Sequence, residues 1–193
     1  MSERIALLTA AAFGALALTA AVVAPVNAQD KMTKSESSGE KTVMVGGAAM
    51  FPSKNIIQNA VNSKDHTTLV AAVKAAGLVT TLEGKGPFTV FAPTNAAFAK
   101  LPAGTVDTLV KPENKATLTK ILTYHVVAGK LEASDLTDGK KLKTVQGEEL
   151  TVKRSGDTVM IIDSKGGSST VTIPNVNQSN GVIHVVDTVL MPS

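Results

Sequence analysis

The strongest constraint on the fold is a change of hydrophobic period near the middle of the chain. Up to about residue 125, apolar residues recur three and four positions apart, as at Ile56, Ile57, Ala60 and Val61, which is the spacing of one helix face. Beyond this point, short runs rich in Val, Ile and Thr alternate with Gly, Asn and Ser, a pattern typical of strands joined by turns. Helices followed by strands predict an α+β domain with an antiparallel sheet, not a doubly wound α/β fold.

Turn and capping residues place these elements along the chain. We expect helices that begin at Asp65, at Thr94 or Asn95 and at Pro112, which are favoured at helix N-termini. One short strand, residues 88–91, falls between them. The strands expected in the second half are 142–145, 149–154, 158–162, 170–173 and 182–190.

The first 28 residues have the pattern of a secretory signal peptide. Arg4 precedes an uncharged run over residues 5–24, Pro25 breaks that run, and Val-Asn-Ala follows at 26–28, which together predict export and cleavage after Ala28. The alternative is a retained membrane anchor, because about 20 apolar residues are long enough to span a bilayer. The weak hydrophobicity of alanine favours the signal peptide, so we expect a secreted, extracellular or periplasmic protein.

The remaining chain divides into a linker and one domain. Residues 29–47 mix charges with serine and glycine and have no apolar period, so we expect a disordered linker. Residues 48–193 contain no internal repeat and are expected to form a single domain. Disulfides are permitted after export, but the chain has no cysteine, so the core must stabilise this domain.

Composition excludes several classes of function. Without cysteine there is no thiol nucleophile, Fe–S cluster or Cys-based zinc site. The chain has three histidines, one tyrosine and no tryptophan, which leaves little aromatic surface for stacking on sugars or unpaired bases. A net charge of +3 is too small to indicate nucleic-acid binding.

Three blocks of sequence carry a resemblance to a known family. They read GPFTVFAPTNAAF at 86–98, LTYHVV at 122–127 and NGVIHVVDTVL at 180–190. They resemble the first signature block, the central Tyr-His motif and the second signature block of the fasciclin domain, in the same order. The resemblance extends over residues 48–193, and a single copy behind a signal peptide is similar to small secreted fasciclin proteins of bacteria.

The resemblance implies both a fold and a function. The fold is a compact wedge of antiparallel strands with helices packed around it. The function is that of a non-enzymatic interaction module for cell adhesion or matrix contact, without a cofactor. We therefore expect a monomer whose partner is a cell-surface or matrix protein or a polysaccharide. We expect no nucleic-acid partner, and membrane contact only through the signal peptide before cleavage.

The aromatic and polar residues of the blocks are interpreted as structural. Alternation along 88–91 directs Phe88 and Val90 to one face of the strand, and Thr89 and Phe91 to the other. His125 extends an apolar helical stripe, which predicts a buried, neutral imidazole that is hydrogen-bonded internally. The residues assigned to this structural motif are Phe88, Phe91, Thr94, Asn95, Phe98, His125 and His184.

No catalytic or metal site is predicted. The chain has no Gly-x-Ser-x-Gly motif, and Ser63, Asp65 and His66, although close in sequence, are interpreted as the polar start of a helix. The carboxylates of Glu148 and Glu149 would point to opposite faces of a strand. His184 and Asp187 are three positions apart and would also diverge.

Two segments are candidates for partner binding. Tyr124, which precedes His125 in the Tyr-His motif, lies off the apolar stripe and is expected to be partly exposed. Pro174 and Asn175 fall where animal members of the family carry a second adhesion motif, Glu-Pro-Asp. Here Ile173 and Asn175 replace its two acids, which argues against metal-dependent recognition of the integrin type.

An alternative function is a carrier for a small molecule or lipid held in an apolar pocket. A large dry cavity would favour the carrier, and a filled core would favour the interaction module. Convergent polar groups in a cleft would favour an enzyme instead.

Overall fold

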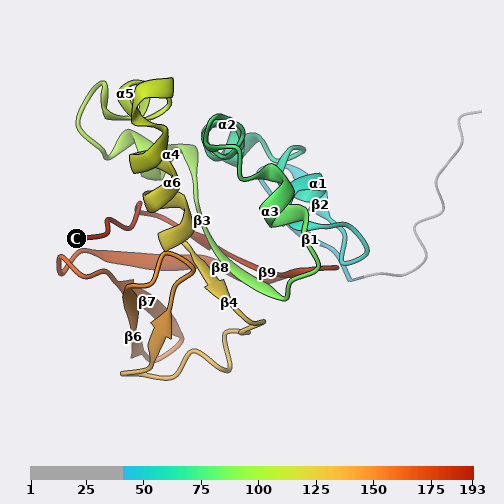
Figure 1. Cartoon of the computed structure of the whole chain (residues 1–193). Helices are drawn as coiled ribbons and strands as arrows, with labels where there is room; N and C mark the ends of the chain where they lie inside the picture. Colours follow the sequence, from blue (N-terminus) through green and yellow to red (C-terminus); the bar gives the residue numbers. More distant parts are fainter. Residues whose placement is uncertain (1–40) are drawn as a thin grey trace, which may run out of the picture. The chain divides into compact units, whose positions relative to one another are not determined.

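The computed structural model describes residues 41–193 (Figure 1). The predicted signal peptide and residues 29–40 of the predicted linker lie outside the described residues. The helices are α1 (Ile56–Ala60), α2 (Thr67–Ala76), α3 (Val79–Glu83), α4 (Asn95–Ala99), α5 (Thr105–Leu109) and α6 (Lys115–Tyr124), with short 3₁₀ turns η1 (Lys64–His66) and η2 (Pro112–Asn114). The strands are β1 (Val43–Val45), β2 (Ala48–Met50), β3 (Phe88–Pro93), β4 (Val126–Ala128), β5 (Lys141–Lys143), β6 (Glu149–Ser155), β7 (Thr158–Ile162), β8 (Ser168–Gln178) and β9 (Gly181–Val186).

Seven of these strands form one sheet in the order β4-β3-β9-β8-β7-β6-β5. The predicted α+β class is confirmed, but the sheet is mixed, because β3 and β9 pair in parallel while the other neighbours are antiparallel. The long connection between β3 and β9 allows the two strands to run in the same direction.

The two edges of this sheet also meet. Val127 of β4 bridges Thr144, just after β5, and the Val145 amide donates to the Val126 carbonyl at 2.8 Å. The sheet is therefore nearly barrel-shaped rather than a simple wedge. A closed sheet leaves fewer unpaired edge groups than an open one.

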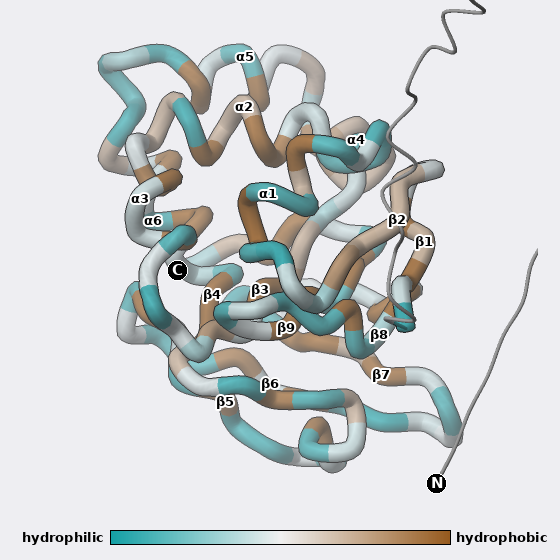
Figure 2. The backbone as a smooth tube through the Cα atoms, turned by 90° about the vertical axis from the view of Figure 1, so that its right-hand side faces the viewer, coloured by the Kyte–Doolittle hydropathy of each residue, from teal (hydrophilic) through white to brown (hydrophobic). Residues whose placement is uncertain are grey.

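Two apolar cores lie on opposite faces of the central strands. One fills the curled sheet and includes Phe91, Leu150 and Ile161, and the other lies between the sheet and the helices and includes Val90 and Ile183. Figure 2 shows the helices on one side of β3 and β9, and β5 and β6 on the other side. Because β3 and β9 are covered on both faces, their sequences are almost continuously apolar.

The β3–β9 pair requires glycine where the strands begin. Phe88 lies opposite Gly181 in the register, and a Cβ on Gly181 would collide with the Phe88 carbonyl. Gly86 has a φ of 37°, and a Cβ there would collide with the Asn180 carbonyl. Both signature blocks thus contribute a glycine that permits close backbone approach.

The ordered domain begins earlier than predicted. β1 and β2 form an antiparallel hairpin, and the side chain of Val45 is only 3% exposed in the core beneath the helices. The predicted boundary at residue 48, with a linker over 29–47, is therefore wrong for residues 43–47. Gly46 and Gly47 adopt positive φ in the tight turn of this hairpin.

Helix starts also differ from the prediction at two positions. Pro112 begins the 3₁₀ turn η2, and α6 begins after it at Lys115. Thr94 caps α4 by accepting a hydrogen bond from the Ala97 amide at 3.2 Å. Asp65 does not begin α2, because it lies within η1. The side-chain oxygen of Asn95 instead accepts from the Thr68 amide at 3.0 Å. Asn95 therefore joins α4 to the first turn of α2 through a cap supplied from another helix.

Among residues 41–193, no helix has both the length and the hydropathy needed to cross a bilayer.

Removing β1 should lower stability. A chain that begins at Ala48 loses the burial of Val45, which should reduce the free energy of unfolding by about 2 kcal/mol. The measurement is thermal unfolding followed by circular dichroism, with a chain that begins at Lys41 as the control. Equal melting temperatures for the two chains would show that β1 contributes nothing to the fold.

Candidate functional site

Tyr124 is fully buried, contrary to the prediction that it is partly exposed. Its side chain is 0% exposed and packs inside the curled sheet. The hydroxyl accepts a hydrogen bond from the Ser164 amide at 2.9 Å and donates to the Glu149 carbonyl at 3.4 Å. The last turn of α6 aims this side chain into the barrel, so Tyr124 cannot contact a partner and serves to join α6 to β6 and the β7–β8 turn.

His125 follows α6 and links it to the C-terminal segment. Its side chain is 2% exposed. Nδ1 donates to the Ile121 carbonyl at 2.9 Å, and Nε2 accepts from the Leu190 amide at 2.9 Å. Burial lowers the pKa of the imidazole to about 4, although the Ile121 carbonyl and Asp163 act in the opposite direction. A neutral ring is required, because a protonated Nε2 could not accept from Leu190.

Pro174 and Asn175 form a bulge in β8, which we call the β8 bulge. The register with β9 shifts between Ile173 and Val176, and Asn175 has a φ of 56°. Pro174 is exposed. The Asn175 side chain is directed inward, where its oxygen accepts from the Ala133 amide at 2.7 Å. Of the two candidate residues, Pro174 is therefore the one whose side chain remains open to a partner.

His184, on the neighbouring strand β9, is hydrogen-bonded to the β8 bulge. The ring is fully buried and stacks on Phe91 with centroids 5.7 Å apart. Nδ1 accepts from the Asn175 amide at 3.3 Å, and Nε2 donates to the Leu131 carbonyl at 2.8 Å. Burial lowers the pKa of this imidazole, while Leu131 and Glu132 raise it less. His184 thus joins the bulge to the loop that follows β4.

Thr89 fixes the same loop from β3. Its hydroxyl donates to the Gly129 carbonyl at 2.6 Å and accepts from the Leu131 amide at 2.9 Å. Residues 129–136, which we call the β4–β5 loop, are therefore attached to β3 by Thr89, to β9 by His184 and to the β8 bulge by Asn175. Sequence pattern did not single out this loop, although Thr89, a polar residue within an apolar strand, was an available signal.

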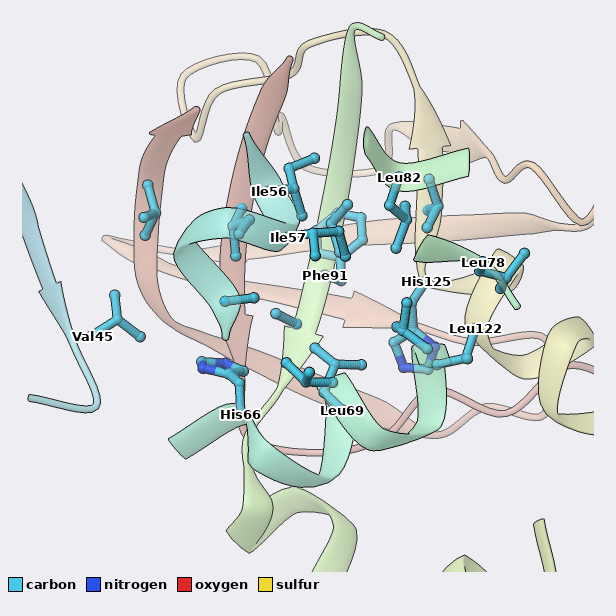
Figure 3. Close-up of a pocket in the computed structure, with 18 of the residues that line it drawn as sticks. Val45, Ile56, Ile57, His66, Leu69, Leu78, Leu82, Phe91, Leu122 and His125 are labelled. Carbon is cyan, nitrogen blue, oxygen red and sulfur yellow. The ribbon is translucent and has the colours of Figure 1, made fainter. Parts of the chain in front are cut away.

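An apolar cavity lies between the helices and the sheet (Figure 3). Side chains of α1 and α2, including Ile56, Ile57 and Leu69, point into it together with the imidazoles of His66 and His125. Its volume is about 40 Å³. An apolar cavity that binds benzene measures roughly 150 Å³, so this cavity is too small for an organic ligand without movement of the surrounding helices.

Ser63 and His66, which lie three positions apart in the sequence, form a contact of the kind that a nucleophile makes with its base. Ser63 Oγ lies 2.9 Å from His66 Nδ1. Their side chains are 1% and 3% exposed, so a substrate cannot reach the serine in this conformation. Burial lowers the pKa of His66 more than the Ala92 backbone and Asp65 raise it. The pair connects the two ends of η1 and is inaccessible to a substrate, so it is interpreted as a structural contact.

The described residues contain no group of three or more His, Cys, Asp or Glu side chains arranged to hold a metal ion. The buried carboxylate of Asp163 is occupied by backbone amides. It accepts from Lys165 and Gly167 at 3.0 and 2.7 Å through one oxygen and from Met191 at 3.1 Å through the other. Asp163 therefore shapes the turn between β7 and β8 and holds the C-terminal segment.

Comparisons of the sequence with a family model and with known proteins identify the family of this domain. The Fasciclin domain family matches residues 64–192. The chain is 49% identical to Protein sll1483 of Synechocystis sp. over 153 residues, covering 79% of this chain and 82% of that protein. It is 36% identical to Immunogenic protein MPB70 of Mycobacterium bovis, covering 100% and 98% of the two chains. It is 40% identical to Cell surface glycolipoprotein MPB83 of the same species, covering 77% and 64%.

A solved structure supports the fold independently. The domain matches a FAS1 domain pair from the insect cell adhesion molecule Fasciclin I with a TM-score of 0.65 and 19% identity. The match covers 73% of this chain and 52% of the solved chain, so the present chain spans about half of that domain pair.

Acid should destabilise the domain through His125. Its pKa is about 4 when folded and about 6.5 when unfolded. Above pH 6.5 the ring is neutral in both states. As pH falls from 6.5 to 4, the unfolded state binds the proton first, and stability falls by up to roughly 3 kcal/mol. Denaturant unfolding at pH 7, 5.5 and 4.5 measures this loss. In His125→Gln the pH slope should become shallower, and an unchanged slope would contradict the assignment.

Replacing Tyr124 with Phe should affect stability but not partner binding. The change keeps the ring and leaves the Ser164 amide without its acceptor, so it should cost about 1–2 kcal/mol. Urea unfolding measures the loss, and attachment to cells at a temperature where the variant is folded measures binding. Reduced attachment of the folded variant would indicate that Tyr124 becomes accessible.

Proposed function

This chain belongs to the fasciclin domain family, and from that premise we propose that it is a non-catalytic surface-interaction module. It is exported and binds a macromolecular partner, a cell-surface or matrix protein or a polysaccharide. The family is an adhesion-type domain, and a relative is described as a cell surface glycolipoprotein. These relationships support a location outside the cytoplasm.

The observation that carries the proposal is the rigid presentation of Pro174. The β8 bulge is bonded to the β4–β5 loop through Asn175, and both are bonded to His184. A protein surface that is already ordered loses little conformational entropy when it binds. Exposed side chains on such loops are also free to change without loss of the core.

The internal polar groups favour binding over catalysis. The Ser63–His66 pair is buried. The polar atoms of Tyr124, His125 and His184 are hydrogen-bonded to backbone groups. A catalytic site requires a nucleophile, a base and an orienting group around a space that a substrate can enter. Among residues 41–193, the serine–histidine contact of Ser63 and His66 lies inside the core.

The volume of the apolar cavity between the helices and the sheet favours the interaction module over a carrier for a small molecule or lipid. About 40 Å³ of apolar space corresponds to a nearly filled core rather than to a binding chamber for a lipid. The interaction module is therefore the better supported of the two functions.

The test is attachment of the fluorescently labelled protein to the surface of the producing cells and to their extracellular matrix. Pro174→Asp should reduce attachment about tenfold, because it places a charge on the exposed bulge. Thr80→Asp, at an exposed position of α3, is the matched control and should attach like the parent. Circular dichroism checks that both variants fold.

Two outcomes would contradict the proposal. One is failure of the folded parent protein to attach to cells or matrix. The other is turnover in a panel of ester, glycoside and phosphate substrates that disappears when one polar residue is replaced.

A further inference from the structure

A second surface lies on the outer side of β5, β6 and β7. Side chains alternate along these strands, and Leu142, Leu150, Val152, Val159 and Ile161 point into the barrel core. The alternate positions therefore point outward. They form a surface that we call the lysine face: Lys141 and Lys143 of β5, Glu149, Thr151 and Lys153 of β6, and Thr158, Met160 and Ile162 of β7.

No helix of the described domain packs on the lysine face. The helices lie on the other side of the central strands in both views (Figures 1 and 2). Met160 and Ile162 are half-buried by their neighbours, yet they belong to neither of the two apolar cores of the described domain. The face is therefore an unpartnered sheet surface with a small apolar centre.

The register arranges the three lysines in a line. Lys143 lies opposite Glu149, and Lys141 lies opposite Thr151, while Lys153 is two residues further along β6. Each two-residue step along a strand is about 7 Å. The ammonium groups are thus attached at successive steps of about 7 Å along the strand direction, with one shift to the neighbouring strand. All three lysines are exposed.

The face has an excess of positive charge. Glu149 is the one carboxylate that strands β5, β6 and β7 project onto it, and it pairs with Lys141 at 3.3 Å. Both side chains of this pair are more than half exposed, and such a pair contributes little to the stability of the fold. Lys141 can therefore exchange Glu149 for an external anion at small cost.

From this arrangement we propose that the lysine face binds an acidic polysaccharide. The polysaccharide lies along the strands, and its carboxylate or sulfate groups contact Lys143, Lys141 and Lys153. Hydroxyl groups of Thr151 and Thr158 hydrogen-bond to the sugars, and Met160 and Ile162 contact the apolar faces of the rings. The surface is independent of the β8 bulge, and it rests on the proposed function only because the protein must meet such a chain outside the cytoplasm.

A periodic anionic polymer fits this face better than a protein does. A protein interface needs a desolvated apolar centre, and the lysine face offers two half-buried apolar side chains surrounded by hydroxyls and lysines. A line of evenly spaced cations matches a polymer that repeats its anionic group. Binding through several weak contacts in series then provides the affinity.

The experiment measures binding of the full-length exported protein to immobilised alginate, a polyuronate, with uncharged dextran as the reference polymer. We expect alginate binding that weakens steeply between 50 and 300 mM NaCl, because salt screens exposed charges, and no binding to dextran. The triple variant K141Q/K143Q/K153Q should bind alginate at least tenfold more weakly, with an unchanged melting temperature.

The matched control is K74Q/K111Q/K115Q, which removes the same charge from exposed lysines of the helical side and should bind like the parent. Equal losses in both triple variants would reduce the effect to net charge and overturn the proposal. Binding of poly-glutamate or of anionic phospholipid vesicles as tightly as alginate would also overturn it. Attachment to cells without alginate binding would contradict this inference but leave the proposed function standing, because the β8 bulge would then carry the attachment.

Discussion

The parallel pairing of β3 with β9 is the interaction on which the rest of the domain depends. It joins the first signature block to the last one over the register from Phe88–Gly181 to Pro93–Val186, and it separates the two apolar cores. The pairing begins where Gly181 lets the two backbones approach closely. Because the two strands are far apart in sequence, this pairing closes a long loop, which costs chain entropy that burial on both faces must offset.

The candidate partner surface is attached to these two strands. Thr89 of β3 and His184 of β9 hold the β4–β5 loop, and His184 also holds the amide of Asn175 in the β8 bulge. The exposed loops are thereby fixed to the most buried part of the sheet. Neutral imidazoles serve as the connectors, since each accepts one backbone amide and donates to one backbone carbonyl. The stability of these contacts is consequently sensitive to acid.

The sequence was sufficient for the features that arise from local pattern. The helix-to-strand change of period predicted the α+β class, and the three blocks led to the family. Strands β6 and β7 were predicted to within a residue of their bounds, because their alternation is regular. The lysine face follows from the same alternation once the inward side of the strands is known.

Features that depend on distant contacts were not predictable from pattern. The parallel β3–β9 pair and the closure at Val127 and Thr144 are set by packing between separated segments. Val45 was assigned to a linker because residues 29–47 as a whole show no apolar period, and the three apolar residues 43–45 are too few to establish one. Tyr124 was expected at the surface because helical periodicity defines one apolar stripe, whereas the end of α6 is enclosed by the barrel as well as by the helices. Asn95 caps a helix distant in sequence, which no local rule identifies.

Amide hydrogen exchange of the intact protein tests the central claim most directly. If the β3–β9 pair holds the partner surface rigidly, the amides of Leu131, Ala133 and Asn175 should exchange far more slowly than that of Ser134, although all four lie outside helices or in irregular parts of the sheet. The amides of β3 and β9 should be the slowest in the domain. Exchange at Leu131 and Asn175 as fast as at Ser134 would contradict the account, because the bulge and the loop would then move independently of the central strands.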